Sequence, residues 1–211
     1  DGDFRGVART ANAGLRYPLI RSRTQDIWAK ARFGYDAFED ELDGANTSDK
    51  RVYTLGLGLQ GNHLDSWQGG GRFNWSVMPT AGDLDLSRNP DSAAADADSF
   101  RTAGSFGKLA YSGSRLQSLG RDISLYATFS GQFASKNLDS SQKFQPSGPN
   151  GVRAYPGGEA SSDQGQLIQL ELRYDRPLPN GLGNLQLQAF YDTAFVQRDK
   201  DPDGVAAPTA S

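Results

Sequence analysis

The chain has 211 residues, no cysteine, and a net charge of −3 from 22 basic and 25 acidic residues. The lack of thiols excludes disulfides, thiolate metal ligands and cysteine nucleophiles. Because the charges are interspersed, the chain offers no clustered Lys/Arg surface of the kind that binds nucleic acid. No window approaches the roughly 18 continuous apolar residues of a transmembrane helix. The length predicts one large domain or two small ones.

Alternation of apolar and polar residues with a period of two is the main pattern along the chain. Residues 53–59 alternate Tyr and Leu with Thr and Gly, and residues 168–174 alternate Ile, Leu and Tyr with Gln, Glu and Arg. This period is typical of strands that have one apolar and one polar face, and no helical stripe occurs. The pattern predicts an all-β fold with about eight strands, near residues 4–19, 26–39, 50–63, 69–78, 99–112, 121–134, 164–177 and 183–196.

The predicted connections alternate between short and long. The short ones lie near 20–25, 64–68, 113–120 and 178–182, the last with the turn dipeptide Asn180-Gly181. The long ones lie near 40–49, 79–98, 135–163 and from 197 onward. Outer-membrane barrels have tight periplasmic turns and long external loops, whereas a soluble sandwich has no reason to alternate in this way. We therefore predict an antiparallel transmembrane β-barrel whose polar residues line a wet lumen.

The sequence offers little support for catalysis or metal binding. His63 is the only histidine, it lies beside a predicted turn, and no Gly-x-Ser-x-Gly elbow precedes a helix. The acidic run at residues 39–43 lacks EF-hand spacing, and the "DKDPDG" segment, with Asp199, Asp201 and Asp203, lacks the distal glutamate of a calcium loop. Solvated outer loops explain both acidic segments. We expect no enzyme activity, no metal and no cofactor.

One pair of charged residues is a candidate site. Asp192 alternates with the apolar set in "LQLQAFYDTAFV", so its side chain and that of Phe190 are expected to point into the lumen. Arg153 lies in the Gly-rich segment "GPNGVRAYPGG". A carboxylate in a lumen can simply be solvated. If water is partly excluded, however, it needs a cation, and arginine offers a bidentate partner.

The same segments resemble a known family. Their order and spacing are similar to the loop and strand motifs of two-partner secretion transporters, the haemolysin activation/secretion proteins of the bacterial outer membrane. Ala154 and Ala194 stand where the family has glycine, and "LRYPLIRSR" at residues 15–23 resembles a further family segment. The matching residues are Val152, Arg153 and Tyr155 in the loop, Asp163 and Gly165 after it, and Phe190 and Asp192 in the strand.

The resemblance implies a function and a location. Family members export an unfolded exoprotein that carries a secretion domain, through a sixteen-stranded barrel in the outer membrane of Gram-negative bacteria. Periplasmic POTRA domains precede that barrel. Residues 1–211 are then expected to be a partial barrel domain in contact with outer-membrane lipid, roughly its sixth to thirteenth strands.

The resemblance also assigns the loop and leaves two alternatives. Residues 135–163 are expected to fold back into the lumen, where Arg153 pairs with Asp192 as a latch. One alternative is a barrel-assembly factor of the same superfamily. The other is a small eight-stranded barrel that binds ligands through its outer loops, in which the first and last strands would have to pair.

Overall fold

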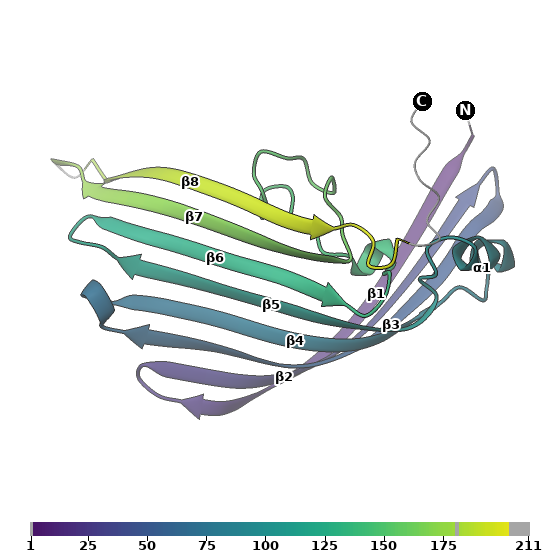
Figure 1. The fold of residues 1–211 in the computed structure, drawn as a ribbon, viewed down its shortest axis with the longest axis horizontal. Coiled ribbons are helices and arrows are strands. Elements are labelled where there is room, and N and C mark those ends of the chain that lie inside the picture. The colour runs from purple at the N-terminus through teal and green to yellow at the C-terminus, as the bar shows by residue number, and fades with distance from the viewer. Residues whose placement is uncertain (1, 180–181, 203–211) are drawn as a thin grey trace.

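The computed structural model describes residues 2–179 and 182–202. It contains a single antiparallel meander sheet in which each strand pairs with its neighbours in sequence (Figure 1). This confirms the prediction of an all-β fold with eight strands. The strands are β1 (Phe4–Arg21), β2 (Gln25–Leu42), β3 (Ala45–Asp65), β4 (Gly71–Asp85), β5 (Gly104–Ser118), β6 (Ile123–Ala134), β7 (Gln164–Pro177) and β8 (Asn184–Gln197).

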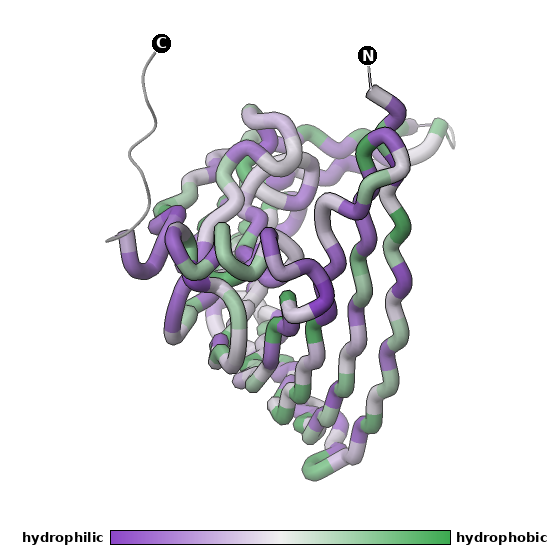
Figure 2. Tube along the Cα trace, turned by 90° about the vertical axis from the view of Figure 1, so that its right-hand side faces the viewer, coloured by the Kyte–Doolittle hydropathy of each residue, from purple (hydrophilic) through white to green (hydrophobic). Residues whose placement is uncertain are grey.

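The strands are long, and their two faces differ in polarity. They run from 12 residues in β6 to 21 in β3, well beyond the five or six residues usual in globular sheets. Hydrophilic and hydrophobic residues alternate along them, as the colours in Figure 2 show. Strands of this length and alternation are what a barrel wall needs to cross a bilayer at a tilt.

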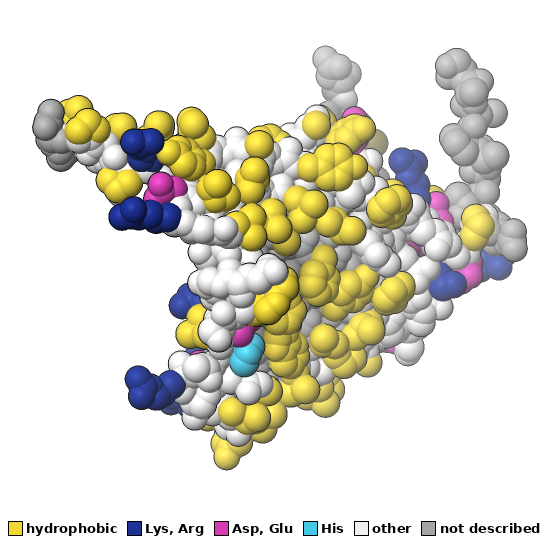
Figure 3. All heavy atoms as spheres, turned by 60° about the vertical axis from the view of Figure 1, so that its left-hand side comes forward, with side chains coloured by type: hydrophobic (Ala, Val, Ile, Leu, Met, Phe, Trp, Pro, Cys, Tyr) yellow, Lys and Arg dark blue, Asp and Glu magenta, His cyan; other side chains and the backbone are white. Residues whose placement is uncertain are grey.

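The outer face of the sheet is apolar and exposed. The register places Leu15 opposite Ala31 and Ala31 opposite Leu57, and further along it places Phe129 opposite Ile168. The hydrophobic side chains form a broad band across the strands, while Lys and Arg lie mostly towards the two ends (Figure 3). An exposed apolar band of this size is costly in water and matches the lipid-facing surface of a membrane barrel.

The inner face is polar and concave. A cavity of about 350 Å³ on this face is lined by polar residues from β1, β2, β3 and β5, among them Asn12, Arg32, Thr54 and Lys108. Gln142, from the connection that follows β6, also lines this cavity. The polar residues of the alternating pattern therefore line the interior of the curved sheet.

The sheet is open. Among the residues described, β1 and β8 each pair on one side only, and they do not pair with each other. The closed eight-stranded barrel, which would need that pairing, is therefore not what the chain forms. Because unpaired strand edges do not occur in the hydrocarbon region of a membrane, the sheet is a fragment of a larger barrel.

The prediction of a long loop at residues 40–49 is wrong. β2 and β3 continue through this region and are joined by a two-residue turn at Asp43 and Gly44, with φ values of 52° and 79°. Positive φ at both positions matches the right-handed twist of a tight hairpin. The acidic residues Glu39, Asp40 and Glu41 consequently lie within β2, so short and long connections do not alternate strictly.

The connection predicted at residues 79–98 contains a helix that the sequence pattern did not indicate. β4 extends to Asp85, and α1 (Pro90–Ala97) follows. The side chain of Asn89 accepts a hydrogen bond of 2.9 Å from the Ser92 amide, and proline occupies the first position of the helix. Local capping therefore forms this helix without an apolar stripe.

No helix in the described part of the chain is long and apolar enough to cross a membrane.

A small apolar cluster lies on the inner face, at the end of the sheet where α1 and the β2–β3 turn are found (Figure 1). Leu138, 2% exposed, packs there against four strand residues, so the start of the 135–163 connection is fixed to the wall. The strand residues of this cluster are Val52, Leu84, Phe106 and Ala134.

Asn180, Gly181 and Asp203, which were named in the sequence patterns, lie outside the residues that the structure describes.

Candidate functional site: a loop held inside the sheet

The loop at residues 135–163 folds back over the polar inner face. Lys50 of β3 pairs with Asp139 at 2.7 Å, and Lys108 of β5 donates to the Gln142 carbonyl at 3.0 Å. Further along, Gln169 of β7 donates to the carbonyl of Gly151 at 2.9 Å. Contacts from β3, β5 and β7 thus hold the loop across much of the width of the sheet.

Arg153 and Asp192 are brought together by this path. The guanidinium Nε lies 2.8 Å from Oδ2 of Asp192 and Nη2 lies 2.9 Å from Oδ1, so the contact is bidentate. The backbone amide of Arg153 also donates to Oδ2, at 3.3 Å. The Asp192 side chain is 4% exposed and that of Arg153 is 24% exposed. A carboxylate this buried depends on its partner for compensation.

Glu171 is a second carboxylate at Arg153, and the sequence reasoning missed it. Nη1 of Arg153 lies 2.9 Å from Oε1 of Glu171, whose other oxygen is held by Arg173. The register places Glu171 of β7 opposite Phe190 of β8. A signal was present, because Glu171 stands on the polar side of the alternation in residues 168–174. Nothing in the sequence, however, indicated that this part of β7 lies next to Arg153 of the loop.

The charges alternate in sign across this cluster. Asp192, Arg153, Glu171 and Arg173 form a chain of two acids and two bases, linked by the ion pairs. The hydrogen bonds to Asp192, and then those to Glu171, raise the pKa of Arg153 above its usual range. The guanidinium therefore stays charged at every physiological pH.

Phe190 forms the floor beneath the guanidinium. The Cζ atom of Arg153 lies 3.8 Å from the centre of the Phe190 ring. An arginine stacked this closely on an aromatic face gains an electrostatic contribution in addition to dispersion. Phe190 therefore positions Arg153 between the two carboxylates.

Replacing Phe190 with leucine is expected to weaken the docking of the loop by about 1 kcal/mol, because the stacking contribution is lost while an apolar floor remains. Protease cleavage of residues 145–161 in the outer-membrane protein measures this change. Tyr191→Leu is the matched control, since Tyr191 belongs to the opposite, exposed face of β8. Equal cleavage of the two variants would contradict a role for the ring.

The segment around Arg153 is a compact turn. The Val152 amide donates to the Pro146 carbonyl at 2.8 Å, and the Gly148 amide donates to the Tyr155 carbonyl at 3.1 Å. Val152 is half-buried, whereas Tyr155 is 58% exposed. Tyr155 borders a hollow of about 420 Å³ between this turn and β8, where Ala194 and Val196 also lie. Asp192 lines the same hollow, but the ion pairs of the charged cluster join Arg153 to Asp192 and Glu171 and do not involve the Tyr155 ring.

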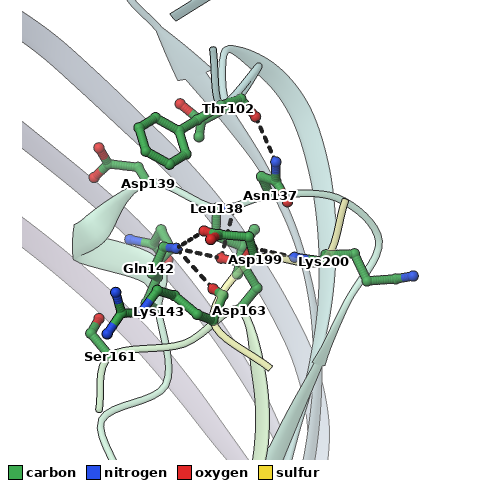
Figure 4. Close-up of polar contacts among 12 residues, drawn as sticks. Thr102, Asn137, Leu138, Asp139, Gln142, Lys143, Ser161, Asp163, Asp199 and Lys200 are labelled. Atoms are coloured by element: carbon green, nitrogen blue, oxygen red, sulfur yellow. Dashed lines mark hydrogen bonds and ion pairs between the residues drawn. The ribbon is translucent and has the colours of Figure 1, made fainter. Parts of the chain in front are cut away.

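Asp163 lies in a second cluster, at the base of the loop (Figure 4), and Gly165 follows it at the start of β7. Asp163 is fully buried and accepts hydrogen bonds from the backbone amides of Leu138 at 3.0 Å and Lys200 at 2.8 Å. At Gly165 a Cβ atom would lie 3.0 Å from the Phe144 ring, so glycine allows the loop to pack closely on β7. The residues of the sequence motifs thus divide between two places.

The described residues contain no group of three or more His, Cys, Asp or Glu side chains that could hold a metal ion. His63 is exposed near the end of β3. The charged residues of the loop site are engaged with one another, so the arrangement can hold or release a segment of chain.

Comparison with known proteins agrees with this architecture. A model of the haemolysin secretion/activation protein family ShlB/FhaC/HecB matches residues 2–210. The heme/hemopexin transporter protein HuxB of Haemophilus influenzae strain 86-028NP is 30% identical over 204 residues, which cover 95% of this chain and 35% of that protein. HuxB of strain ATCC 51907 is 29% identical over 176 residues, 82% of this chain and 30% of that protein.

Solved structures show the same fold. CdiB from Escherichia coli superposes with a TM-score of 0.77 at 18% identity, covering 93% of this chain and 36% of that one. CdiB from Acinetobacter baumannii gives 0.68 at 18% identity, covering 92% and 33%. The chain thus spans about a third of the length of the relatives it matches. It belongs to the haemolysin secretion/activation family of two-partner secretion transporters, and it forms part of the β-barrel.

Proposed function

We propose that the protein containing this chain secretes a large partner exoprotein, such as a haemolysin or adhesin, across the outer membrane of a Gram-negative bacterium. The exoprotein carries a secretion domain and passes through the polar interior of the completed barrel, while outer-membrane lipid surrounds the apolar face. The curated relatives are transporters, and HuxB is described as a heme/hemopexin transporter protein. The partner of this chain is proposed only as an exoprotein.

The observation that carries the proposal is the placement of the loop. Residues 135–163 lie on the concave polar face, where Arg153 is held by Asp192 of β8 and Glu171 of β7. A loop inside a barrel obstructs the path of any large passenger. An ion pair that holds such a loop, rather than a continuous apolar core, can break and re-form at a moderate cost in free energy.

In this mechanism the latched loop is the resting state and the transported chain displaces it. Asp192 and Glu171 hold Arg153 from two sides, while Phe190 supports the guanidinium from below. Only differential binding can shift such an equilibrium. The exoprotein must therefore bind the barrel more tightly when the loop is released. No ATP or cofactor takes part.

Deleting the gene in its source bacterium tests the proposal and separates it from the alternative of a barrel-assembly factor. We expect one large protein to disappear from the culture medium and the cell surface, while the other outer-membrane barrels keep their normal amounts. Proteomics of the medium and of purified outer membranes measures both. Complementation with the intact gene is the control. A general loss of outer-membrane barrels would support assembly, and an unchanged medium would refute secretion.

A further inference from the structure

Asp163 connects parts of the chain that are distant in sequence. Besides the amides of Leu138 and Lys200, its carboxylate contacts Nζ of Lys143 at 3.2 Å. Its own backbone amide donates to the Arg198 carbonyl at 3.0 Å, and its carbonyl accepts from Gln132 at 3.1 Å. The side chain has no exposed surface. One residue thus joins the end of β6, the loop and the segment that follows β8.

The neighbours of Asp163 extend this connection (Figure 4). The three protons of the Lys143 ammonium have three acceptors, because it also contacts the Arg198 carbonyl at 3.0 Å and Asp199 at 3.1 Å. Asn137 donates to the carbonyls of Phe100 at 2.8 Å and Asp201 at 3.0 Å. This part of the loop is therefore fastened to the connections before β5 and after β8.

Residues 145–161 are held differently. Their hydrogen bonds and ion pairs to the strands, within the described part of the chain, come from Gly151 and Arg153 only. At the neck of this segment Phe144 and Ser162 exchange two backbone hydrogen bonds, of 2.7 and 3.0 Å. Glycines at 148 and 158 have φ values of 89°, a conformation that other residues adopt only with strain.

We infer that Asp163 is a positioning residue that divides the loop into a fixed base, residues 135–144 with 162 and 163, and a releasable tip, residues 145–161. The inference rests on the proposed function. Lifting the base would break the contacts of Asp163, Lys143 and Asn137 together, whereas releasing the tip breaks only those of Gly151 and Arg153. During transport the tip leaves the lumen wall and the base stays in place.

Cysteine accessibility in the full-length transporter tests the division. Because the chain has no cysteine, single probes can be placed beneath each part, in a transporter without other cysteines. Ala134→Cys reports on the base, since Ala134 packs in the apolar cluster with Leu138. Leu167→Cys reports on the tip, since the 5% exposed Leu167 borders Asn150. The rate of labelling by a membrane-impermeant maleimide on whole cells is measured for each probe.

Two substitutions should act on different probes. Arg153→Ala is expected to speed labelling of the Leu167→Cys probe about tenfold or more, because the loss of one charge-assisted hydrogen bond implies a factor of this size. The same substitution is expected to leave the Ala134→Cys probe protected. Asp163→Asn is expected to expose the Ala134→Cys probe. If Arg153→Ala exposes both probes equally, or Asp163→Asn leaves the base protected, the division is wrong. Lys143→Gln replaces Asp163→Asn should the latter fail to reach the membrane.

A disulfide across the base gives a second test. The Asn137 side chain bridges to the backbone of Asp201 through hydrogen bonds of 2.8 and 3.0 Å. A cysteine pair is therefore placed at these two positions, and formation of the disulfide is verified on a non-reducing gel. Secretion is expected to be equal under oxidising and reducing conditions, and each single cysteine is the control. Secretion blocked only when the disulfide is formed would overturn the inference. Accessibility does not depend on secretion, so a failure of the proposed function would be recognised separately.

Discussion

Replacing Arg153 with alanine in the full-length transporter is expected to abolish most secretion while the protein still reaches the outer membrane, because the latched resting state from which transport starts could no longer form. Asp192, 4% exposed, would lose both guanidinium contacts, and Glu171 would lose its contact as well. Removing one partner of a buried pair costs about 3 kcal/mol, more than the pair itself contributes. The amounts of exoprotein in the medium and of transporter in the membrane measure the result. Arg153→Lys should be intermediate, because lysine keeps the charge and loses the bidentate geometry.

Exchanging the two charges is expected not to restore secretion. In the protein with Arg153→Asp and Asp192→Arg, a carboxylate at position 153 would face Glu171, which lies 2.9 Å from Arg153 in the native chain. Glu171 would lose its cation and gain a like charge nearby, which disfavours this arrangement. A single Glu171→Gln substitution is the control for this contribution and should reduce secretion less than Arg153→Ala. Full rescue by the exchange would show that Glu171 is unimportant and that the pair acts alone.

Replacing Gly151 with alanine is expected to disrupt the latch although Arg153 is intact. A Cβ atom at Gly151 would overlap with the backbone carbonyl of Pro146, and backbone cannot move aside as a flexible side chain can. The carbonyl of Gly151 also accepts the hydrogen bond from Gln169. The strain, on the order of 2 kcal/mol, would displace the turn that presents Arg153. Secretion and protease cleavage of the loop tip measure the effect.

The matched control for Gly151→Ala is Gly157→Ala. Gly157 lies in the same loop tip, but nothing lies within 4 Å of a Cβ atom built on it. Its φ angle is not positive, so an alanine fits there without backbone strain. This variant should secrete normally and resist protease as the native protein does. Loss of secretion in both variants would indicate that the tip needs flexible glycines in general, and would contradict the specific overlap at Gly151.

The latch shows how far sequence reasoning reaches. The placement of Asp192 follows from alternation, because a period of two assigns each residue to a face. The meeting of Arg153 with Asp192 was implied by the family resemblance and not by alternation. Glu171 was missed because alternation assigned it to the polar face but did not show that Arg153 would lie beside it. The register that places Glu171 opposite Phe190 is a property of the paired strands.

The errors at the loops have a related cause. Residues 40–49 are polar and rich in Asp and Asn, a composition typical of loops, yet they extend the β2–β3 hairpin. A polar composition indicates that a segment is exposed to water, but it does not distinguish a loop from a strand. A strand that projects beyond the apolar band is as exposed as a loop. The helix α1 was missed because its signal is a cap at Asn89 and not an apolar stripe. Such short-range signals are visible in the sequence but compete with the loop interpretation.

The sequence by itself determined the all-β class, the approximate places of the eight strands, the polar and apolar faces, and the residues of the loop motif. The class, the strands and the faces follow from the period of the side chains and from turn chemistry, which are local properties of the chain. The residues of the loop motif follow from the family resemblance. Only the tertiary structure decided that Arg153 is shared by two carboxylates and that Asp163 fastens the base of the loop. Both depend on segments up to 39 residues apart along the chain, which are brought together by the curvature and register of the sheet.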